Sequence, residues 1–307
     1  MSEVPRACGV DRLNFVIGLT ITLGSVLGGY AATGGYLGVL DQPFEFLIIC
    51  GASTGIFIVA NPLPTIKDAG KAIFEAITDR TPERRDYLDL LNALHALMRE
   101  LRSHSRAEVE AHFDNPRASP VFSGFPRLLA NEDLLSFVCD YGRLIIIGNA
   151  KTYEIEALMN DDIAMLAYDR YKPVHALRSI ADSLPALGII AAVLGVVHAM
   201  RSLDSSPEIL GGLIGAALIG TFTGILLSYA VVGPIALKVW SVRQQQLRLF
   251  SLSKQSLLAF MNGAMPQVAI EFGRKMIPLR ERPTIDTVES ETIAGPPQIA
   301  VTTLAVA

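Results

Sequence analysis

Four stretches of the chain are apolar over a length that suits a bilayer, which takes roughly 20 residues of helix to cross. They cover residues 14–40, 44–63, 184–200 and 210–237. Only Asp41-Gln42-Pro43 separates the first two stretches, so these two are expected to form a helical hairpin. The last two stretches are also close together and predict a second hairpin.

A cleaved signal peptide is the alternative for the first stretch, because Ala31-Ala32-Thr33 loosely resembles a cleavage site. The apolar run is longer than the apolar region of a signal peptide, however, and a second span follows at once. Both points favour a spanning helix. The sequence therefore predicts a multi-pass membrane protein with four transmembrane helices.

The distribution of Lys and Arg predicts the orientation of these spans, since such residues concentrate in cytoplasmic loops. Basic residues follow the second span, precede the third and follow the fourth: Lys67, Lys71, Arg170, Lys172, Arg178, Lys238, Arg243 and Arg248. The link after the first span has no Lys or Arg, and the link after the third has only Arg201. Both termini and the long middle segment are therefore predicted to be cytoplasmic.

The polar segments show helical rather than β periodicity. Apolar residues recur at three- and four-residue steps at Tyr87, Leu90 or Leu91, Leu94, Leu97 or Met98, and Leu101. Thr81 is the expected N-cap of this helix, before Pro82-Glu83. Residues 132–159 are expected to be further helix, and residues 238–262 are expected to extend the fourth span. No alternating pattern of useful length occurs, so the predicted fold class is all-α.

These patterns divide the chain into five segments. Residues 1–63 are the N-terminal segment and first transmembrane hairpin, 64–183 a cytoplasmic helical domain, and 184–237 the second hairpin. Residues 238–282 are a cytoplasmic C-terminal helical segment. Residues 283–307 are rich in Thr, Pro, Ala and Val without helical periodicity, which predicts a disordered tail.

Composition supports a membrane protein and offers no metal site. Half of the residues are hydrophobic and 18% are charged, whereas about a quarter are charged in soluble proteins. Cys8, Cys50 and Cys139 lie far apart in no ligand spacing. We expect reduced thiols, with no disulfide framework and no zinc.

Two sequence patterns resemble enzyme motifs but lie in the wrong context. Residues 51–55 match the G-x-S-x-G pattern of a hydrolase nucleophile, which needs a strand–turn–helix and here falls inside a spanning helix. Gly70-Lys71 resembles part of a P-loop, but positions 65 and 72 are Thr and Ala. The five histidines form no ligand pair at helical spacing. We therefore expect no catalytic residues and no enzyme.

Small residues form one face on each of the last two spans. On the third span they are Gly188, Ala192, Gly195 and Ala199, and on the fourth Gly212, Ala216, Gly220, Gly224 and Ser228. Such faces let membrane helices approach closely, and plain packing would explain either face alone. Pro185 and Pro234 stand at the cytoplasmic ends of these spans. Together the features indicate helices built to move or to hold a partner.

The spans lack an obvious carboxylate in their cores. Transporters usually carry a charged residue within the membrane. Here Glu45 is expected at the outer edge of the second span and Asp182 at the cytoplasmic mouth of the third. If ions pass through this protein, a partner must supply the titratable group.

Several segments together give the chain a clear family resemblance. They are Gly28-Gly29-Tyr30 with Thr33-Gly34-Gly35; Asp114-Asn115-Pro116-Arg117; Glu154 to Met159; Asp182 to Ala186 with Gly195 to Ala199; Gly220-Thr221-Phe222; and Glu271 to Lys275. With these segments the sequence resembles the MotA family of flagellar stator subunits, related more distantly to TolQ and ExbB. The resemblance extends to about Pro283.

The resemblance implies a partner and an assembly. Family members form a ring of A subunits, a pentamer, around a pair of single-span, peptidoglycan-anchored MotB-type subunits in the inner membrane. The B subunit carries the ion-binding aspartate, and spans three and four of the A subunit line the ion path. No cofactor or nucleic acid is implied, and the remaining contacts are with lipid.

The resemblance also assigns roles to individual residues. Pro185 and Pro234 match two prolines linked to conformational change, and Thr221 matches a pore-facing threonine. Arg102 and Glu110 match a charged pair that meets the rotor switch complex, for which a solvated helical face is the alternative reading.

Ion choice depends on Ala192, where sodium-type members have a second threonine. A methyl group offers no oxygen to partly dehydrated Na⁺, which predicts H⁺ rather than Na⁺ as the transported ion. The alternative function is a TolQ/ExbB-like proton-driven energiser of an outer-membrane system, although those relatives have three spans. A self-sufficient permease is disfavoured by the missing intramembrane charge.

Overall fold

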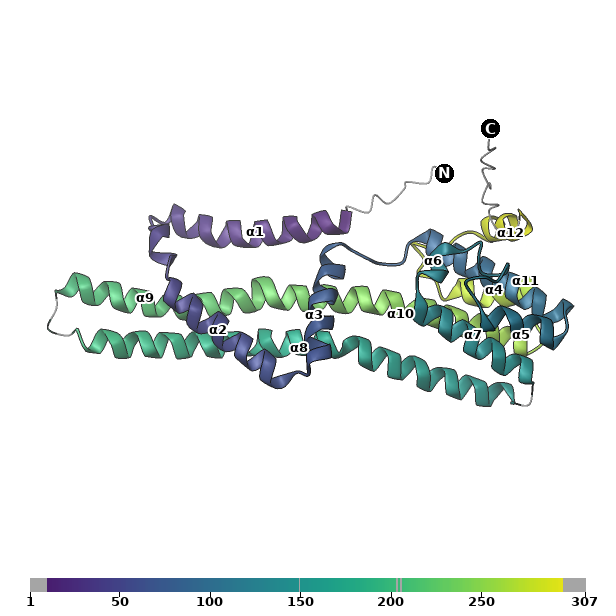
Figure 1. The fold of residues 1–307 in the computed structure, drawn as a ribbon. Helices are drawn as coiled ribbons and strands as arrows, with labels where there is room; N and C mark the ends of the chain where they lie inside the picture. The colour runs from purple at the N-terminus through teal and green to yellow at the C-terminus, as the bar shows by residue number, and fades with distance from the viewer. Residues whose placement is uncertain (1–9, 149, 203, 205, 295–307) are drawn as a thin grey trace, which may run out of the picture. The chain divides into compact units, whose positions relative to one another are not determined.

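The computed structural model describes residues 10–294 except 149, 203 and 205. The described residues form helices and no strands (Figure 1), and four helices are long and apolar enough to cross a membrane. The prediction of an all-α protein with four transmembrane helices is confirmed. Within the described part, residues 10–80 and 169–243 form a first unit, and residues 81–168 and 244–294 form a second.

The first unit begins with two spanning helices. They are α1 (Val10–Ala32) and α2 (Pro43–Ala60), with a short 3₁₀ helix at Leu37–Leu40 between them. The prediction that the first span continues to residue 40 is wrong, because α1 ends at Ala32. Gly34 has φ +85°, a left-handed conformation that suits glycine, and the Gly35 N–H donates to Tyr30 O. Hydropathy does not detect this turn, because the residues after it are still apolar.

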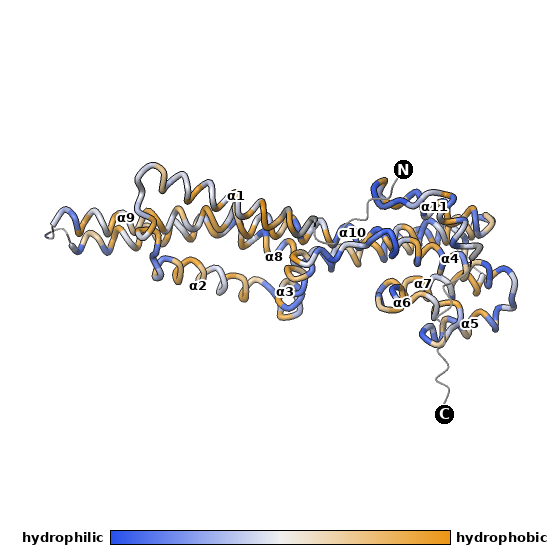
Figure 2. Tube along the Cα trace, turned by 90° about the horizontal axis from the view of Figure 1, so that it is seen from above, coloured by the Kyte–Doolittle hydropathy of each residue, from blue (hydrophilic) through white to orange (hydrophobic). Residues whose placement is uncertain are grey.

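The second hairpin consists of α8 (Thr152–Met200) and α9 (Pro207–Leu226). A π-helical turn at Leu227–Val232 follows α9, and α10 (Gly233–Met261) continues from it. The third span is therefore the end of a 49-residue helix that begins before the membrane segment. The helix expected over residues 238–262 is present as the continuation of the fourth span. Figure 2 shows hydrophobic residues along α9 and α2.

An amphipathic helix, α3 (Leu63–Ile77), packs against α8 and α10 in the first unit. The contact consists of small and branched apolar residues: Ala72, Ala76, Val174, Leu177, Ala236, Val239 and Val242. Charged groups flank this contact. Lys238 Nζ donates to Asp79 Oδ1 at 2.7 Å, and Arg243 Nη2 donates to Asp68 Oδ1 at 2.8 Å. Apolar packing and ion pairs thus both hold α3 in place.

The second unit is a helical domain with one hydrophobic core. Its helices are α4 (Arg84–Ser103), α5 (Arg106–Asp114), α6 (Pro126–Leu129), α7 (Glu132–Ile147), α11 (Pro266–Lys275) and α12 (Ile285–Ala294), with parts of α8 and α10. The stripe predicted on α4 is buried from Tyr87 to Met98. Burial raises the pKa of Tyr87 to about 12. The periodicity in the sequence therefore identified the core face of α4 correctly.

The start of α4 differs from the prediction. Glu83, not Thr81, is the N-cap, and α4 begins at Arg84. The Asp86 carboxylate accepts a hydrogen bond from Glu83 N–H at 2.7 Å, and the Glu83 side chain accepts one from the Asp86 N–H. This reciprocal capping box satisfies two N–H groups at once, so it fixes the helix start after Pro82.

The helix predicted over residues 132–159 is interrupted. Helix α7 ends at Ile147, Gly148 has φ +72°, and α8 begins at Thr152. A glycine in the left-handed conformation is a common helix C-cap. The Gly148 N–H donates to Leu144 O, which closes the last turn of α7.

The disordered tail predicted from residue 283 is wrong for residues 285–294, which form α12. Val288 on this helix is buried in the core of the second unit. The Glu291 carboxylate accepts a hydrogen bond from Asn92 Nδ2 on α4 at 3.2 Å. Tertiary contact with α4 thus stabilises a helix whose own sequence has little helical pattern. Residues 295–307 of the predicted tail lie outside the described residues.

Candidate functional site

Helices α8 and α9 make close backbone contact at a pair of glycines. A Cβ atom on Gly224 would lie 2.6 Å from Leu184 O and 2.9 Å from Gly188 Cα. A Cβ atom on Gly188 would lie 2.8 Å from Gly220 O. Farther out, a Cβ on Gly195 would lie 2.7 Å from Ala217 Cβ. The small faces predicted from sequence therefore pack against each other over this part of the hairpin.

Thr221 and Ala192, two residues predicted to line an ion path, lie at this same contact. Thr221 is half-buried, and its Oγ1 lies 3.5 Å from the Gly188 carbonyl oxygen. Ala192 is also half-buried, and its backbone N lies 3.4 Å from the position of a Cβ on Gly220. The structure thus brings both residues to one level of the hairpin. Their role in ion passage stays a prediction.

Pro185 interrupts the hydrogen bonding of α8. Proline has no N–H, so the carbonyl four residues earlier, that of Ala181, loses its donor within the helix. Ser228 Oγ donates to Ala181 O at 2.6 Å, and both residues are buried. A hydroxyl from the neighbouring helix therefore replaces the bond that Pro185 removes.

Pro234 lies just beyond the π-helical turn, and Ser228 also takes part there. The Gly233 N–H donates to Ser228 O, five residues earlier. A Cβ atom on Gly233 would lie 2.9 Å from that same oxygen. The side chain of Ser228 thus bonds the carbonyl that Pro185 leaves without a donor, and its backbone carbonyl accepts a bond in the turn before Pro234. Sequence reasoning treated Ser228 only as a small residue.

We expect Ser228→Ala to lower the stability of the protein by about 1–2 kcal/mol, because a buried carbonyl loses its donor. In a Pro185→Ala background the new N–H can serve Ala181, so the same change should have little further effect. Thermal unfolding of the purified protein with both single variants and the double variant measures this coupling. Additive losses of stability would contradict it.

The carboxyl group of Glu45 lies close to α9. Its Oε2 is shielded from solvent and has no hydrogen-bond partner among the described residues. This oxygen lies 3.2 Å from the position of a Cβ on Gly220, the neighbour of Thr221. Glu45 is in the first turn of α2, so the expectation that it lies at the outer edge of its span is confirmed. Helix α9 begins 13 residues before Gly220, roughly 20 Å along the helix axis, so its first turns extend past the start of α2.

Arg102 and Glu110, the predicted rotor contacts, belong to the second unit. Both side chains are exposed, Arg102 near the end of α4 and Glu110 on α5. A turn at His104 and Ser105 joins the two helices. Ser105 caps α5 and hydrogen-bonds Glu108, which lowers the pKa of that carboxyl. Arg102 Nη1 also contacts Met265 Sδ.

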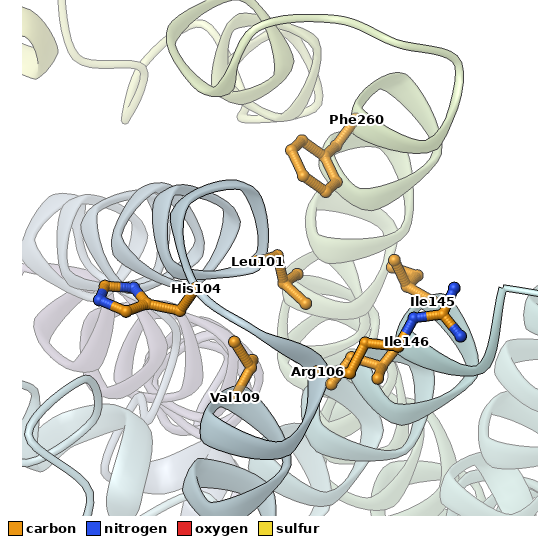
Figure 3. Close-up of a pocket in the computed structure, with 7 residues that line it drawn as sticks. All are labelled: Leu101, His104, Arg106, Val109, Ile145, Ile146 and Phe260. Carbon is orange, nitrogen blue, oxygen red and sulfur yellow. The ribbon is translucent and has the colours of Figure 1, made fainter.

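A pocket of about 220 Å³ lies beside this turn (Figure 3). Its lining is Leu101, His104, Arg106, Val109, Ile145, Ile146 and Phe260. Five of the seven lining residues are apolar, and His104 and Arg106 have polar side chains. The pocket could not be found from sequence, because its lining comes from α4, α5, α7, α10 and the turn after α4.

The cysteines differ in environment. Cys139 is buried, and burial raises the pKa of its thiol to about 11. Cys50 is exposed on α2. Cys8 lies outside the described residues. Within the described part of the chain, no group of three His, Cys, Asp or Glu side chains could hold a metal ion.

Comparison with known proteins places these features in a family. Residues 16–105 match the motility protein A N-terminal family model, and residues 131–250 match that of the MotA/TolQ/ExbB proton channel family. Motility protein A of Salmonella typhimurium is 41% identical over 91% of this chain and 95% of its own length. The chain belongs to the MotA family. Motility protein A of Escherichia coli shows the same identity and coverage.

Other relatives of this MotA-family protein extend the comparison. Chemotaxis protein LafT of Vibrio parahaemolyticus is 32% identical over 89% of the chain and 96% of its own length. Two solved structures share the fold at low identity. That of C. jejuni MotAB has a TM-score of 0.69 at 16% identity, covering 87% of this chain and 96% of that one. The flagellar MotAB stator complex from Bacillus subtilis has a TM-score of 0.63 at 21% identity, covering 90% and 98%.

Proposed function

We propose that this MotA-family protein is a stator subunit of the flagellar motor in the bacterial inner membrane. It couples the flow of protons to torque on the rotor, and it is not an enzyme. The observation that carries the proposal is the 41% identity to motility protein A over 95% of that protein's length. Such a match, extending over both hairpins and the second unit, favours a stator over the alternative of a TolQ/ExbB-like energiser.

The proposed partners are a MotB-type single-span subunit and further copies of this chain in a ring, a pentamer by family resemblance. Two solved relatives are complexes named MotAB. The hairpin leaves large apolar side chains exposed that lipid or partner helices would cover: Ile189, Val193, Leu194, Val197, Leu218 and Ile225. The Lys/Arg distribution supports cytoplasmic termini.

The proposed mechanism uses the contact between α8 and α9. Protonation of the B subunit's aspartate removes a charge near Thr221 and changes which A-subunit face that side chain prefers. Pro185 and Pro234 break helical hydrogen bonding at two points linked through Ser228. These points are where α8 and α10 can bend as protons enter and leave. Successive protonations then step the A ring around the B pair.

Proton rather than sodium coupling rests on Ala192, which offers no side-chain oxygen next to Thr221. We expect cells that depend on this stator to keep swimming when sodium is removed at constant proton-motive force. Loss of swimming on sodium removal would overturn the ion assignment. An Ala192→Thr variant is the matched comparison, because it restores the oxygen found in sodium-type members.

Rotor contact is proposed for Arg102 and Glu110, which are exposed and close to one turn. Reversing either charge (Arg102→Glu or Glu110→Lys) should weaken torque, because an attractive exposed pair becomes repulsive. An exposed pair contributes about 1 kcal/mol, so the expected loss of rotor engagement is roughly fivefold. Swimming speed and rotation of tethered cells measure it.

Two comparisons make this prediction specific. The opposite charge reversal on the rotor should partly restore torque for each variant. Arg99→Glu, one turn earlier on α4 and also exposed, should have a smaller effect that no rotor variant rescues. Absence of rescue for both Arg102 and Glu110 would argue against direct contact.

A further inference from the structure

Glu45 places a carboxyl group at the seam between α8 and α9. The position of a Cβ on Gly220 lies 3.2 Å from Glu45 Oε2, 3.1 Å from Ala191 Cβ and 3.4 Å from Ala192 N. One carboxyl oxygen therefore lies level with the two residues proposed to line the ion path, Thr221 and Ala192. A side chain at position 220 would be in tight contact with this oxygen.

If Glu45 only stabilised the start of α2, its carboxyl would bond the free backbone N–H groups there. Glu45 is in the first turn of α2, where an acidic side chain can bond free backbone N–H groups or favour the helix dipole. Glu45 Oε2 has no such hydrogen bond and no solvent exposure. Burying a polar oxygen without a partner costs roughly 1–3 kcal/mol, and a charged oxygen costs more. The helix start does not explain why the oxygen is aimed at α9.

Neighbouring charged groups do not explain the position of Glu45 Oε2 either. Titratable and charged groups at the outer ends of the surrounding elements include Tyr36 and Asp41 before α2, His198 and Arg201 at the end of α8, and Glu208 at the start of α9. No ion pair joins any of them to Glu45 among the described residues. Glu45 Oε2 is therefore a shielded oxygen on a partly buried side chain, with no cationic partner among the described residues. Ionisable residues at membrane depth commonly mark proton routes.

We propose that Glu45 is a protonatable site of the A subunit on the outer approach to the ion path. The proposal rests on the proposed proton-driven stator function and adds a second carboxyl to the one supplied by the B subunit. A hydronium ion outside gives its proton to the carboxylate, forming an O–H bond and leaving water. That O–H bond breaks when the proton passes to a water molecule on the ion path, which regenerates the carboxylate.

Two substitutions separate proton transfer from packing. Glu45→Gln keeps the size of the side chain but cannot ionise, whereas Glu45→Asp keeps the ionisable group on a shorter side chain. A proton site requires Asp to retain more activity than Gln, and a packing role requires the reverse. We expect at least a tenfold loss of proton flux with Gln and less than a threefold loss with Asp. Flux is measured in inverted vesicles that contain equal amounts of assembled complex.

A spectroscopic measurement tests the site without relying on motility. Infrared difference spectra of the purified wild-type complex, taken between acidic and alkaline buffer, should contain a carboxyl band that Glu45→Gln removes. Where Glu45→Gln does not assemble, Glu45→Asp serves instead, and the same band should shift to the position of an aspartic acid. An unchanged spectrum overturns the proposal, as does a flux for Gln equal to or above that of Asp.

The two proposals fail in different ways. If wild-type cells run on sodium, the proposed ion is wrong while the Glu45 band still titrates. If wild-type cells run on protons and the band is absent, the stator function stands and Glu45 is structural.

Discussion

Gly224→Val should abolish assembly of the second transmembrane hairpin and stop motility. The first side-chain atom at this position would lie 2.6 Å from Leu184 O and 2.9 Å from Gly188 Cα. Both neighbours are backbone atoms, which cannot rotate away as a flexible side chain would. Overpacking usually costs about 1–3 kcal/mol, and separating two packed helices forfeits their other contacts as well. Complex recovered from membranes by affinity purification measures the effect.

Gly215→Val is the matched control for this prediction. Gly215 lies on the same helix, and a Cβ there would have no atom of the described chain within 4 Å. The control should therefore leave the hairpin intact. Equal loss of complex for both variants would show that valine on α9 is harmful for another reason, such as contact with a neighbouring subunit.

Arg243→Ala should destabilise the first unit by about 3 kcal/mol, the low end for breaking a buried ion pair. Arg243 is 7% exposed and bonds Asp68 at 2.8 Å, and Glu75 Oε2, on a side chain 9% exposed, lies 3.4 Å away. Removing the guanidinium leaves Asp68 without its cation, and it leaves the buried Glu75 with only the exposed Lys71, whose Nζ lies 3.9 Å from Glu75 Oε1. The midpoint of thermal unfolding of the purified complex should fall by roughly 10 °C.

Two variants test whether the lost charge pairing is the cause. Arg178→Ala removes an exposed arginine of α8 and should change the midpoint little. Combining Arg243→Met with Glu75→Gln removes the buried charges together and should recover part of the loss, since an apolar replacement of a buried pair is often tolerated. A double variant no more stable than Arg243→Ala would point to lost packing instead.

The features that sequence predicted are those set by local composition. Apolar length identified all four spans, and the three- and four-residue spacing from Tyr87 to Met98 identified the core face of α4. Family resemblance pointed to Thr221, Ala192, Pro185 and Pro234, of which Thr221 and Ala192 lie together at the α8–α9 contact. Their functional roles are still predictions.

The features that sequence missed depend on residues far apart in the chain. The bond from Ser228 to Ala181 joins residues 47 positions apart, and no local pattern indicates it. Glu45 approaches Gly220 because two hairpins of unequal length lie side by side. Helix α12 forms where Val288 and Glu291 meet α4 and the core around it. The turn at Gly34 was missed because hydropathy reports on side chains, not on backbone angles.

The π-helical turn at Leu227–Val232 gives the fourth span one residue more than an α-helix would use over the same turn. An α-helix advances about 100° per residue. In the π turn, hydrogen bonds join residues five apart, against four apart in an α-helix. If this turn became α-helical and the neighbouring turn took up the extra residue, the first turns of α10 would rotate by about that angle relative to α9. The fourth span can thus change the rotation of α10 relative to α9 at the turn that contains Ser228, the residue whose side chain joins this span to α8.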